Sequence, residues 1–411
     1  MKAYQDASLA PARRAKALLE EMTLAEKIGQ LNQRLYGFRI YERKCVNGED
    51  TIELSEEFCQ EVEKYSGLGV LYGLYRADPW ADKDYETGLT GVLSKKAYNQ
   101  VQRYVLEHSR LGIPVMMSSE CPHGHQALDG YLLPVNLLAG ATFDPAMVRA
   151  AYRVSGRQLQ NMGVDLALMS MLDVLRDPRW GRSEECYSED PYLSARMAEA
   201  AVIGMQESGP EVVAKHFAAQ GEGTGGVNAS AARIGERELR EIHFPPAAAA
   251  IKAGAKGIMA AYNEIDGVYC HANRWLLNDV IRKEMGFDGI VMSDGVAIDQ
   301  LDSMTGDNVV SGALALQSGV DVGLWDEAFG KLEEAVRRGL VKESQIDQAV
   351  LRVLTLKFER GLFEHPYLEE EGEIHMDYAQ NPESVQLARE GLVILQNKNQ
   401  GLPFWENQAS G

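Results

Sequence analysis

The sequence predicts an α/β fold of the TIM-like (β/α) barrel type. From about residue 68, short apolar segments rich in β-forming residues alternate with longer segments of helical periodicity, which is typical of a parallel sheet built from βα units. These segments are apolar on both faces, as expected where helices cover one side of a sheet and a filled interior lies on the other. Polar side chains stand where several segments end, at the edge of such a barrel that carries chemistry. We therefore predict one large barrel domain over residues 1–365.

Seven apolar segments are predicted as strands of this barrel, and an eighth element is irregular or missing. Several intervening helices are preceded by Asp or Asn and followed by Gly, the residues preferred at helix ends. At the N-terminus, Ser8 or Thr23 is the expected capping residue of a further helix. The predicted strands are 69–75, 113–120, 164–174, 212–219, 256–263, 289–295 and 320–325, and the predicted helices include 145–162, 191–207, 235–254, 273–285 and 310–318.

A doubly wound open sheet is the alternative architecture. Such a sheet is normally accompanied by a glycine-rich nucleotide-binding loop after an early strand. The segment "GEGTGG" (221–226) follows a predicted strand, yet it lacks both the Lys-Ser/Thr of a P-loop and the G-x-G-x-x-G spacing. The barrel is therefore favoured, and we expect no cofactor.

The acidic composition argues against nucleic acid and membrane partners. Lys and Arg total 41 against 60 Asp and Glu, and the resulting net charge of −19 repels phosphate backbones and anionic lipids. No stretch approaches the roughly 18 consecutive apolar residues that cross a bilayer, and the N-terminus has neither the apolar centre nor the cleavage site of a signal peptide. We therefore expect a cytoplasmic protein whose five separated cysteines are mostly free thiols.

The pattern changes near residue 365. Residues 366–383 are polar and acidic with two prolines, and we predict a linker there. Residues 384–411 are predicted to form a helix, a strand and a turn, with "LVIL" (392–395) as the strand. An isolated apolar strand has an unpaired edge, which proteins usually cover. We therefore predict that a second domain begins at residue 384, and that a further C-terminal domain or a partner chain completes it.

Polar residues finish most of the predicted strands, and in a barrel these strand ends converge on one site. Carboxylates and cations in such a ring are suited to binding a polyhydroxylated ligand, because charged groups form strong hydrogen bonds to hydroxyls. An Asp at a strand end can also simply cap the next helix, and the Arg and Glu residues can form an ion-pair network on a loop. The ring contains Glu120, Asp173, Arg179, Trp180, Arg182, Glu185, Lys215, His216, Tyr262, Asn263 and Asp294.

Lys215 and His216 pose a geometric question, because neighbouring residues of a regular strand point to opposite faces. Both side chains can reach one ligand only if the backbone departs from regular strand geometry, through a β-bulge or a non-proline cis peptide. A lysine at a buried strand end also needs a charged partner or a polar cavity. His123 and His125 have no third ligand at a suitable spacing, so no metal site is predicted.

A series of motifs extends over most of the chain and resembles one family. In order and spacing these motifs resemble the N-terminal barrel domain of glycoside hydrolase family three, the β-glucosidase and β-xylosidase family. The motifs are "MTLAEKIGQL" (22–31), "SSECPHGH" (118–125), "LDVLRDPRWGRSEECYSEDPYL" (172–193), "AKHFAAQGEG" (214–223), "RELREIHFPP" (237–246), "GIMAAYNEIDG" (257–267), "LLNDVIRKEMGFDGIVMSDG" (276–295) and "AREGLVILQNKNQGLPF" (388–404).

The resemblance implies an exo-acting retaining glycoside hydrolase, similar to β-glucosidases, that removes terminal β-linked sugars with Asp294 as nucleophile. A retaining enzyme also needs a second carboxyl group about 5–5.5 Å from the first. The family usually takes this acid/base from a following α/β sandwich domain, so residues 384–411 are expected to begin one. Within this chain, Glu185 and Glu222 are the carboxylates to test as substitutes. The residues that the resemblance places around the terminal sugar are Glu120, Arg182, Lys215, His216 and Tyr262.

Gly295 departs from the family pattern, in which an aromatic residue often follows the nucleophile directly. An aromatic wall beside the sugar is therefore lost or supplied by another residue, and the choice between a glucoside, a xyloside and another β-glycoside of the same family stays open. The alternative function is a sugar-binding barrel that lacks its acid/base and has no turnover. A metal- or phosphate-dependent barrel enzyme is disfavoured, since no His₃, His₂-carboxylate or carboxylate-cluster pattern occurs.

Overall fold

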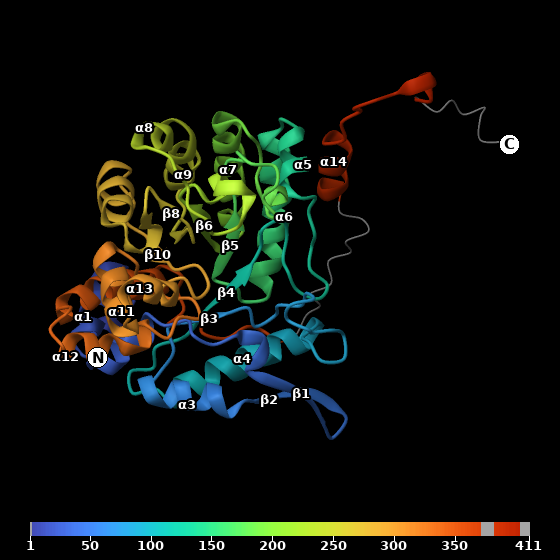
Figure 1. The fold of residues 1–411 in the computed structure, drawn as a ribbon. Helices are drawn as coiled ribbons and strands as arrows, with labels where there is room; N and C mark the ends of the chain where they lie inside the picture. The colour runs from blue at the N-terminus through green and yellow to red at the C-terminus, as the bar shows by residue number, and fades with distance from the viewer. Residues whose placement is uncertain (1, 371–381, 403–411) are drawn as a thin grey trace.

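The centre of the computed structural model, which describes residues 2–370 and 382–402, is a parallel sheet (Figure 1). Its six strands lie in the order β10-β7-β6-β5-β4-β3, and every pairing between them is parallel. The sheet forms a half-barrel with helices outside it, in agreement with the predicted TIM-like α/β class. Its strands are β3 (Val70–Tyr72), β4 (Met116–Glu120), β5 (Leu166–Ser170), β6 (Glu211–Phe217), β7 (Gly257–Ala260) and β10 (Ile290–Met292).

Six of the seven predicted strands are confirmed, each shorter than predicted, and the prediction of a regular strand over 320–325 is wrong. That segment makes one parallel bridge, Met292 to Val322, and its backbone is irregular because Trp325 has a left-handed φ of 62°. It nevertheless runs beside β10, since Ser293 donates to the carbonyl of Val322 at 2.8 Å and Val296 donates to that of Leu324 at 2.8 Å.

Residues 29–36 lie between the two edges of the sheet. On one side, the amides of Gly323 and Trp325 donate to the carbonyls of Leu31 and Gln33 at 3.0 and 2.9 Å. On the other side, the amide of Gly69 donates to the carbonyl of Gly29 at 3.0 Å, and a parallel bridge joins Tyr36 to Tyr72 in β3. This polar segment, unlike the strands, carries no continuous apolar run that the sequence pattern could reveal.

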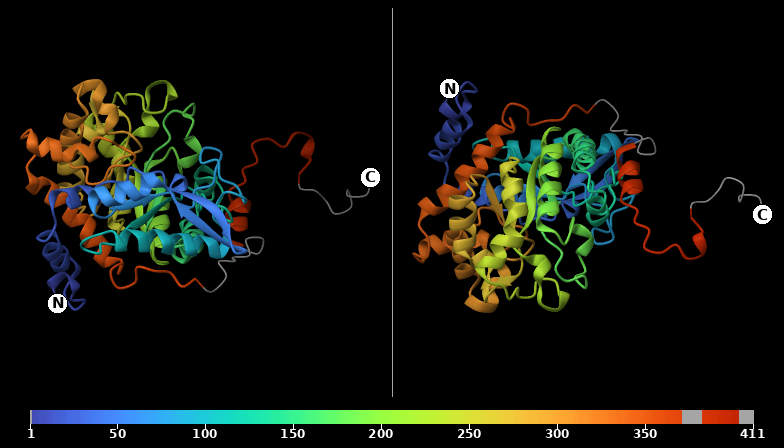
Figure 2. Two further views of the ribbon diagram at one scale, coloured as in Figure 1. Left: turned by 90° about the horizontal axis from the view of Figure 1, so that it is seen from below. Right: turned by 90° about the horizontal axis from the view of Figure 1, so that it is seen from above.

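The helices pack outside the sheet, with α5, α6, α7 and α9 along one side of it and α1 and α14 on opposite sides of the molecule (Figures 1 and 2). The predicted helices are confirmed, but those predicted over 235–254 and 273–285 include π-helical turns. In the first case Pro245 and Pro246 lack the amide that an α-helical bond requires. The helices of four or more residues are α1 (Pro11–Leu19), α2 (Leu24–Gln30), α3 (Glu56–Tyr65), α4 (Gly91–Glu107), α5 (Asn136–Ala141), α6 (Pro145–Asn161), α7 (Pro191–Gln206), the π-helices Leu239–His243 and Trp275–Glu284, α9 (Phe244–Lys252), α10 (Asp302–Thr305), α11 (Asn308–Ser318), α12 (Leu332–Arg337), α13 (Glu343–Glu359) and α14 (Pro382–Glu390).

Thr23 and Ser8 have different roles at the N-terminus. Thr23 caps α2, where its side chain accepts from the amide of Glu26 and the Glu26 carboxylate accepts from the Thr23 amide, a complete capping box. The alternative, Ser8, caps no helix; its hydroxyl donates to Asp6, and α1 begins after Ala10 instead. Pro11 at the first helical position explains this start, since its missing amide needs no acceptor.

A β-hairpin that was not among the predicted elements projects from the half-barrel. Strands β1 (Tyr41–Val46) and β2 (Glu49–Leu54) pair in antiparallel register through Asn47 and Gly48. Both turn residues have positive φ, 55° and 86°, as a two-residue type I′ turn requires. In the sequence, the Asn-Gly dipeptide is the feature that could have predicted this hairpin.

The C-terminal region confirms the predicted helix but not the predicted strand. Helix α14 packs against α5 and α6. The segment 392–395 is not a strand, and its four apolar side chains are 65–93% exposed, because no described strand lies beside it to pair with. Residues 371–381 of the predicted linker and residues 403–411 lie outside the described residues, whereas Leu368, at the start of the linker, is hydrogen-bonded to Asn99 of α4.

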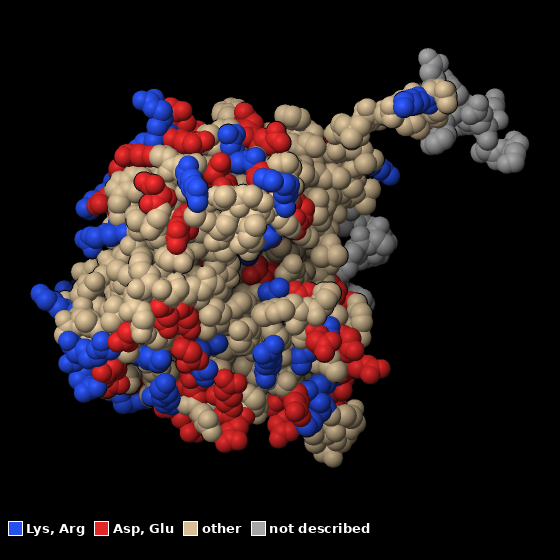
Figure 3. All heavy atoms as spheres, viewed as in Figure 1, with Lys and Arg blue, Asp and Glu red and all other residues tan. Residues whose placement is uncertain are grey.

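The surface carries charges of both signs, and Lys and Arg are interspersed with Asp and Glu over the face in Figure 3. Among the described helices, none is both long enough and apolar enough to cross a membrane.

Candidate active site

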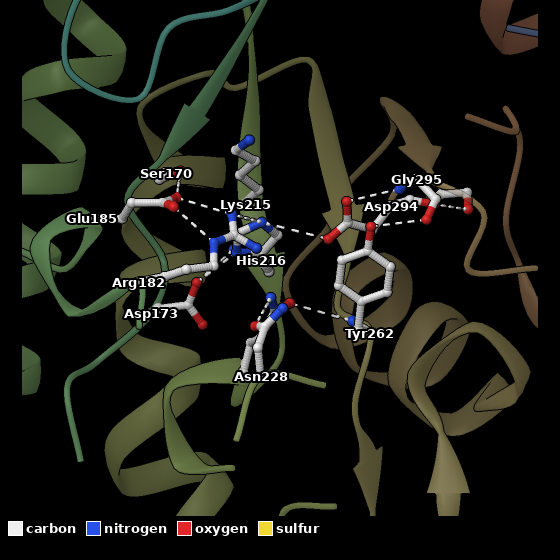
Figure 4. Close-up of polar contacts among 12 residues, drawn as sticks. Ser170, Asp173, Arg182, Glu185, Lys215, His216, Asn228, Tyr262, Asp294 and Gly295 are labelled. Carbon is white, nitrogen blue, oxygen red and sulfur yellow. Dashed lines mark hydrogen bonds and ion pairs between the residues drawn. The ribbon is translucent and has the colours of Figure 1, made fainter. Parts of the chain in front are cut away.

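The sheet brings the predicted site residues together at the carboxyl ends of its strands (Figure 4). Glu120 is the last residue of β4, and Lys215 and His216 lie near the end of β6. Tyr262 and Asp294 each follow a strand by two residues, β7 and β10 respectively, and Arg182 is on the loop after β5. Parallel strands place these ends at one edge, which is why residues so distant in sequence meet.

The backbone at Lys215 and His216 departs from regular strand geometry, as predicted. The peptide between the two residues is cis, and the register of β6 against β7 shifts between Ala214 and Phe217. Lys215 contacts Glu120 at the end of β4, two strands away, while His216 contacts Asp173 on the loop after the adjacent strand β5. Both side chains therefore belong to the same site.

Lys215 and Glu120 form a buried ion pair. The Lys215 Nζ donates to Glu120 Oε2 at 2.6 Å, and the two side chains are only 5% and 13% exposed. The other carboxylate oxygen accepts from the Tyr72 hydroxyl at 3.0 Å and lies 4.0 Å from the Arg76 guanidinium. Burial would raise the pKa of Glu120, yet the charges of Lys215 and Arg76 outweigh it and lower the pKa, so this carboxyl group is held ionised.

His216 is neutral and its tautomer is fixed by its partners. Its Nε2 lies 3.0 Å from an Arg182 nitrogen, and a guanidinium can only donate, so this ring nitrogen must be the acceptor. The proton is therefore on Nδ1, which donates to Asp173 Oδ2 at 2.7 Å. Asp173 also accepts from the His216 amide, so the ring is held on both sides.

Arg182 is fixed by two bonds to Glu185. The guanidinium donates to the two oxygens of Glu185 at 2.7 and 3.0 Å, a bidentate geometry that orients it firmly. Burial would lower the pKa of Arg182, but the carboxylates of Glu185, Asp294 and Asp173 raise it. Burial likewise would raise the pKa of Glu185, but Arg182 and then Lys215 bring it well below its usual range. Figure 4 shows Arg182 and His216 between Glu185 on one side and Asp294 on the other.

Asp294 combines a fixed backbone with an oxygen that has no bonding partner. Its Oδ1 accepts from the Gly295 amide at 2.8 Å, and its own amide donates to His271 Nε2 at 3.2 Å. Among the described residues, Oδ2 is buried and accepts no hydrogen bond; it lies 3.6 Å from the unprotonated Nε2 of His216. A capping Asp would use its carboxylate on helix amides, so this oxygen is left to interact with a ligand.

Tyr262 lies beside Asp294 and is held by a hydrogen bond to Gly295, the residue after Asp294. Its hydroxyl donates to the carbonyl of Gly295 at 2.8 Å, and its amide donates to Gln220. Burial raises the pKa of Tyr262, and the neighbouring Asp294 carboxylate raises it further. The phenol is therefore a neutral hydrogen-bonding group beside Asp294.

Not all predicted residues join this cluster. Arg179 is exposed and pairs with Asp177, as the ion-pair alternative proposed. Asn263 is fully buried and donates to the carbonyl of Ala218. His125 packs in the interior, with its Nε2 at 2.9 Å from Ser119 Oγ, and Glu222 pairs with Arg176 at 3.3 Å.

Three residues of the site were not predicted from the sequence: Tyr72 and Arg76, which lie beside Glu120, and Trp325, whose ring contacts Tyr72. Arg76 directly follows the predicted strand 69–75, so the rule already used would have found it. Tyr72 lies within that predicted strand and ends β3 only because the observed strand is shorter. Trp325 ends the seventh predicted strand, 320–325, so examining the end of that segment would also have found it, although the segment is not a regular strand in the structure.

Comparison with known proteins agrees with this arrangement. Residues 23–356 match the family described as "Glycosyl hydrolase family 3 N terminal domain". The chain belongs to glycosyl hydrolase family 3.

Relatives described as β-glucosidases and β-xylosidases are similar over 80–95% of this chain. It is 30% identical over 408 residues to a periplasmic β-glucosidase of Salmonella typhimurium, covering 94% of this chain and 48% of that protein. It is 32% identical over 364 residues to a β-xylosidase of Formosa agariphila, covering 80% of this chain and 49% of that one. A crystal structure of a β-glucosidase from Listeria innocua in complex with glucose superposes with a TM-score of 0.79 at 30% identity, covering 95% of this chain and 52% of that one. The chain thus spans about half the length of the relatives it matches.

Proposed function

We propose that this chain carries the nucleophile and the terminal-sugar pocket of a retaining, exo-acting β-glycosidase. The observation that carries the proposal is the Asp294 carboxylate, buried at a strand end with Oδ2 unpartnered among the described residues. In a retaining mechanism this oxygen attacks the anomeric carbon, the bond to the leaving group breaks, and a covalent glycosyl-enzyme forms.

The remaining residues fit the binding of a terminal sugar. Glu120 and Lys215 present an ionised pair, and Arg182, His216 and Tyr262 surround the nucleophile. Charged donors and acceptors bind hydroxyls strongly because their hydrogen bonds are charge-assisted. The bonds that fix these groups to one another, such as His216 to Asp173, hold them in place before a sugar arrives.

Glu185 is not suited to act as the general acid/base of this mechanism. A general acid must be protonated near neutral pH, whereas Glu185 is locked in two bonds to Arg182 with its pKa well below the usual range. We propose that the acid/base comes from outside the described residues, in a further domain or a partner chain, and that residues 384–411 belong to the start of an α/β sandwich domain.

The complete barrel and the cytoplasmic location both stay predictions. We propose that the half-barrel, segment 320–325 and segment 29–36 together make a complete (β/α) barrel, supported by the hydrogen bonds that join them. The cytoplasmic location stays a prediction, and one relative is described as periplasmic.

We propose a β-glucoside as the substrate, because relatives described as β-glucosidases include one whose structure holds glucose. A β-xyloside is the second candidate, favoured by the β-xylosidase relative. The two sugars differ by one hydroxymethyl group, so parallel assays with glucosyl and xylosyl substrates of the same leaving group decide between them.

The test is covalent trapping with 2-deoxy-2-fluoro-β-glucosyl fluoride. Fluoride leaves without protonation, so Asp294 can displace it even where no acid/base is present, and the 2-fluorine slows hydrolysis of the product. We expect the intact mass to rise by one glycosyl unit, and peptide mapping to place that unit on Asp294. Asp294→Asn should remove the label, and Asp82→Asn, an exposed matched control, should keep it. Binding of glucose without any label would favour the sugar-binding alternative and reject the proposed nucleophile.

A further inference from the structure

Gly295 directly follows the proposed nucleophile, and the space above it is filled by another residue. A Cβ built on Gly295 would lie 2.5 and 2.6 Å from two ring carbons of Trp325, far inside van der Waals contact. Gly295 does not have a positive φ, so its backbone would accept any L-residue. The indole of Trp325, rather than the backbone, therefore excludes a side chain at this position.

Trp325 cannot easily move away from Gly295. The Val296 amide donates to the carbonyl of Leu324 at 2.8 Å, and the Tyr262 hydroxyl donates to the carbonyl of Gly295. The Trp325 amide is itself bonded to Gln33 of the segment 29–36. Both backbones are thus tied in place at the point of contact.

Aromatic neighbours fix the orientation of the indole. Tyr36 stacks on Trp325 at 4.6 Å between centroids with 24° between planes, and Tyr72 meets it edge-on at 4.8 Å. Trp80, 46% exposed, completes the group at 5.2 Å. Since the Tyr72 hydroxyl bonds Glu120, the indole extends from the residue beside Asp294 towards the carboxylate proposed to bind the sugar.

The indole also has an unused polar atom. Trp325 Nε1 is buried and has no acceptor among the described residues. Buried indole N–H groups usually have a partner, and a sugar hydroxyl is one that this pocket would supply. A sugar that contacts both Asp294 and Glu120 would lie alongside this ring.

We propose that Trp325 is a specificity-determining residue of this site, and that Gly295 is a glycine because Trp325 supplies the aromatic wall beside the nucleophile. The proposal rests on the proposed function and adds the residue that selects among sugars. The ligand class is a β-linked pyranoside whose apolar face packs on the indole.

An exchange of the two residues tests the proposal. The variants are Gly295→Trp, Trp325→Gly and the double variant, and glycine suits position 325 because φ there is 62°. We expect Gly295→Trp to slow labelling of Asp294 by the 2-fluoroglucosyl fluoride at least about 100-fold, and the double variant to recover at least about tenfold of that loss. Gly295→Ala, alone and with Trp325→Gly, repeats the comparison with a smaller side chain in case Gly295→Trp does not fold.

A specificity readout separates a wall from a purely structural tryptophan. Trp325→Gly should change the ratio of glucosyl to xylosyl labelling rates by at least about fivefold, because pocket contacts to one small group are worth about 10–200-fold, whereas a loss of folded protein lowers both rates equally. Tyr192→Gly, which removes an exposed aromatic side chain of α7, is the control and should leave the ratio unchanged.

The outcomes are distinct. If the wild-type chain is labelled at Asp294 but the double variants label no faster than the single Gly295 variants and the sugar ratio is constant, the role of Trp325 is refuted and the proposed function stands. If the wild-type chain is not labelled at all, the proposed function fails, and this wall fails with it.

Discussion

Removing the charge of Lys215 should destabilise the protein far more than removing a surface lysine. The Lys215–Glu120 pair is 2.6 Å long and its side chains are 5% and 13% exposed. At an effective dielectric constant of about 20 the attraction at this distance is about 6 kcal/mol, most of which only offsets the cost of burying two ions. Lys215→Met would leave Glu120 buried with Tyr72 and, 4.0 Å away, Arg76. Breaking a buried pair costs about 3–5 kcal/mol, and with Arg76 still present we expect the lower end, about 3 kcal/mol.

The assay is urea unfolding of Lys215→Met, Glu120→Gln and the double variant. Because each single change leaves one unpaired buried group, the double variant should lose about 2 kcal/mol less than the sum of the two. Lys256→Met is the matched control, since Lys256 pairs with Glu359 at 3.0 Å but both side chains are more than one-third exposed. Exposed pairs contribute about 0–1 kcal/mol. A Lys215→Met loss equal to that of the control, or strict additivity in the cycle, would refute the reasoning.

Three further predictions concern pH and packing. Burial lowers the pKa of both His125 and His271 from 6.5 to about 4, so the unfolded chain takes up protons before the folded protein does as the pH falls. The stability that each neutral histidine contributes, up to about 3 kcal/mol, is complete above pH 6.5 and is lost towards pH 4. Melting temperatures measured from pH 7.5 to 4.5 should therefore fall less steeply in His125→Gln than in wild type. Thr23→Ala should cost about 1 kcal/mol in urea unfolding by removing the capping box of α2, and an unchanged midpoint would contradict it. Gly69→Ala should cost more than about 2 kcal/mol, since its Cβ would lie 2.3 Å from the Gln30 carbonyl oxygen, whereas Gly235→Ala, with open space around it, should change little.

The sequence predicted the regular part of the fold because its signal is local. Buried parallel strands such as "GIVM" are apolar on both faces, so six of them were recognisable from their own residues. The segment 29–36 was not, because its backbone bonds are made with residues near 69 and near 323, and its own side chains include Asn32, Gln33 and Arg34. The strand predicted over "LVIL" failed for the converse reason: apolar residues suit a strand only where a neighbour pairs with them.

The positions of site residues at the ends of strands were predictable from the sequence. The contacts that these residues make with side chains of other segments were not. The departure of the backbone at Lys215 and His216 was predictable because two candidate site residues stand in succession there. The partners that set their states did not follow in the same way: the tautomer of His216 depends on Arg182 and Asp173, and the ionisation of Glu120 depends partly on Arg76. The contact of Trp325 with Gly295 depends on a left-handed residue in an irregular segment, which no periodicity reports.

The position of residues 29–36 has a consequence for how the protein folds. This segment is made early in synthesis, but its neighbour on one side, Gly323 to Trp325, follows almost three hundred residues later in the sequence. Contacts between residues so far apart form slowly because the loop between them must first be ordered. We therefore expect the contact between segments 29–36 and 320–325 to be the last to form. A chain interrupted before residue 320 should keep β3 paired with residues 29–36 but leave β10 and segment 29–36 each with one unpaired side.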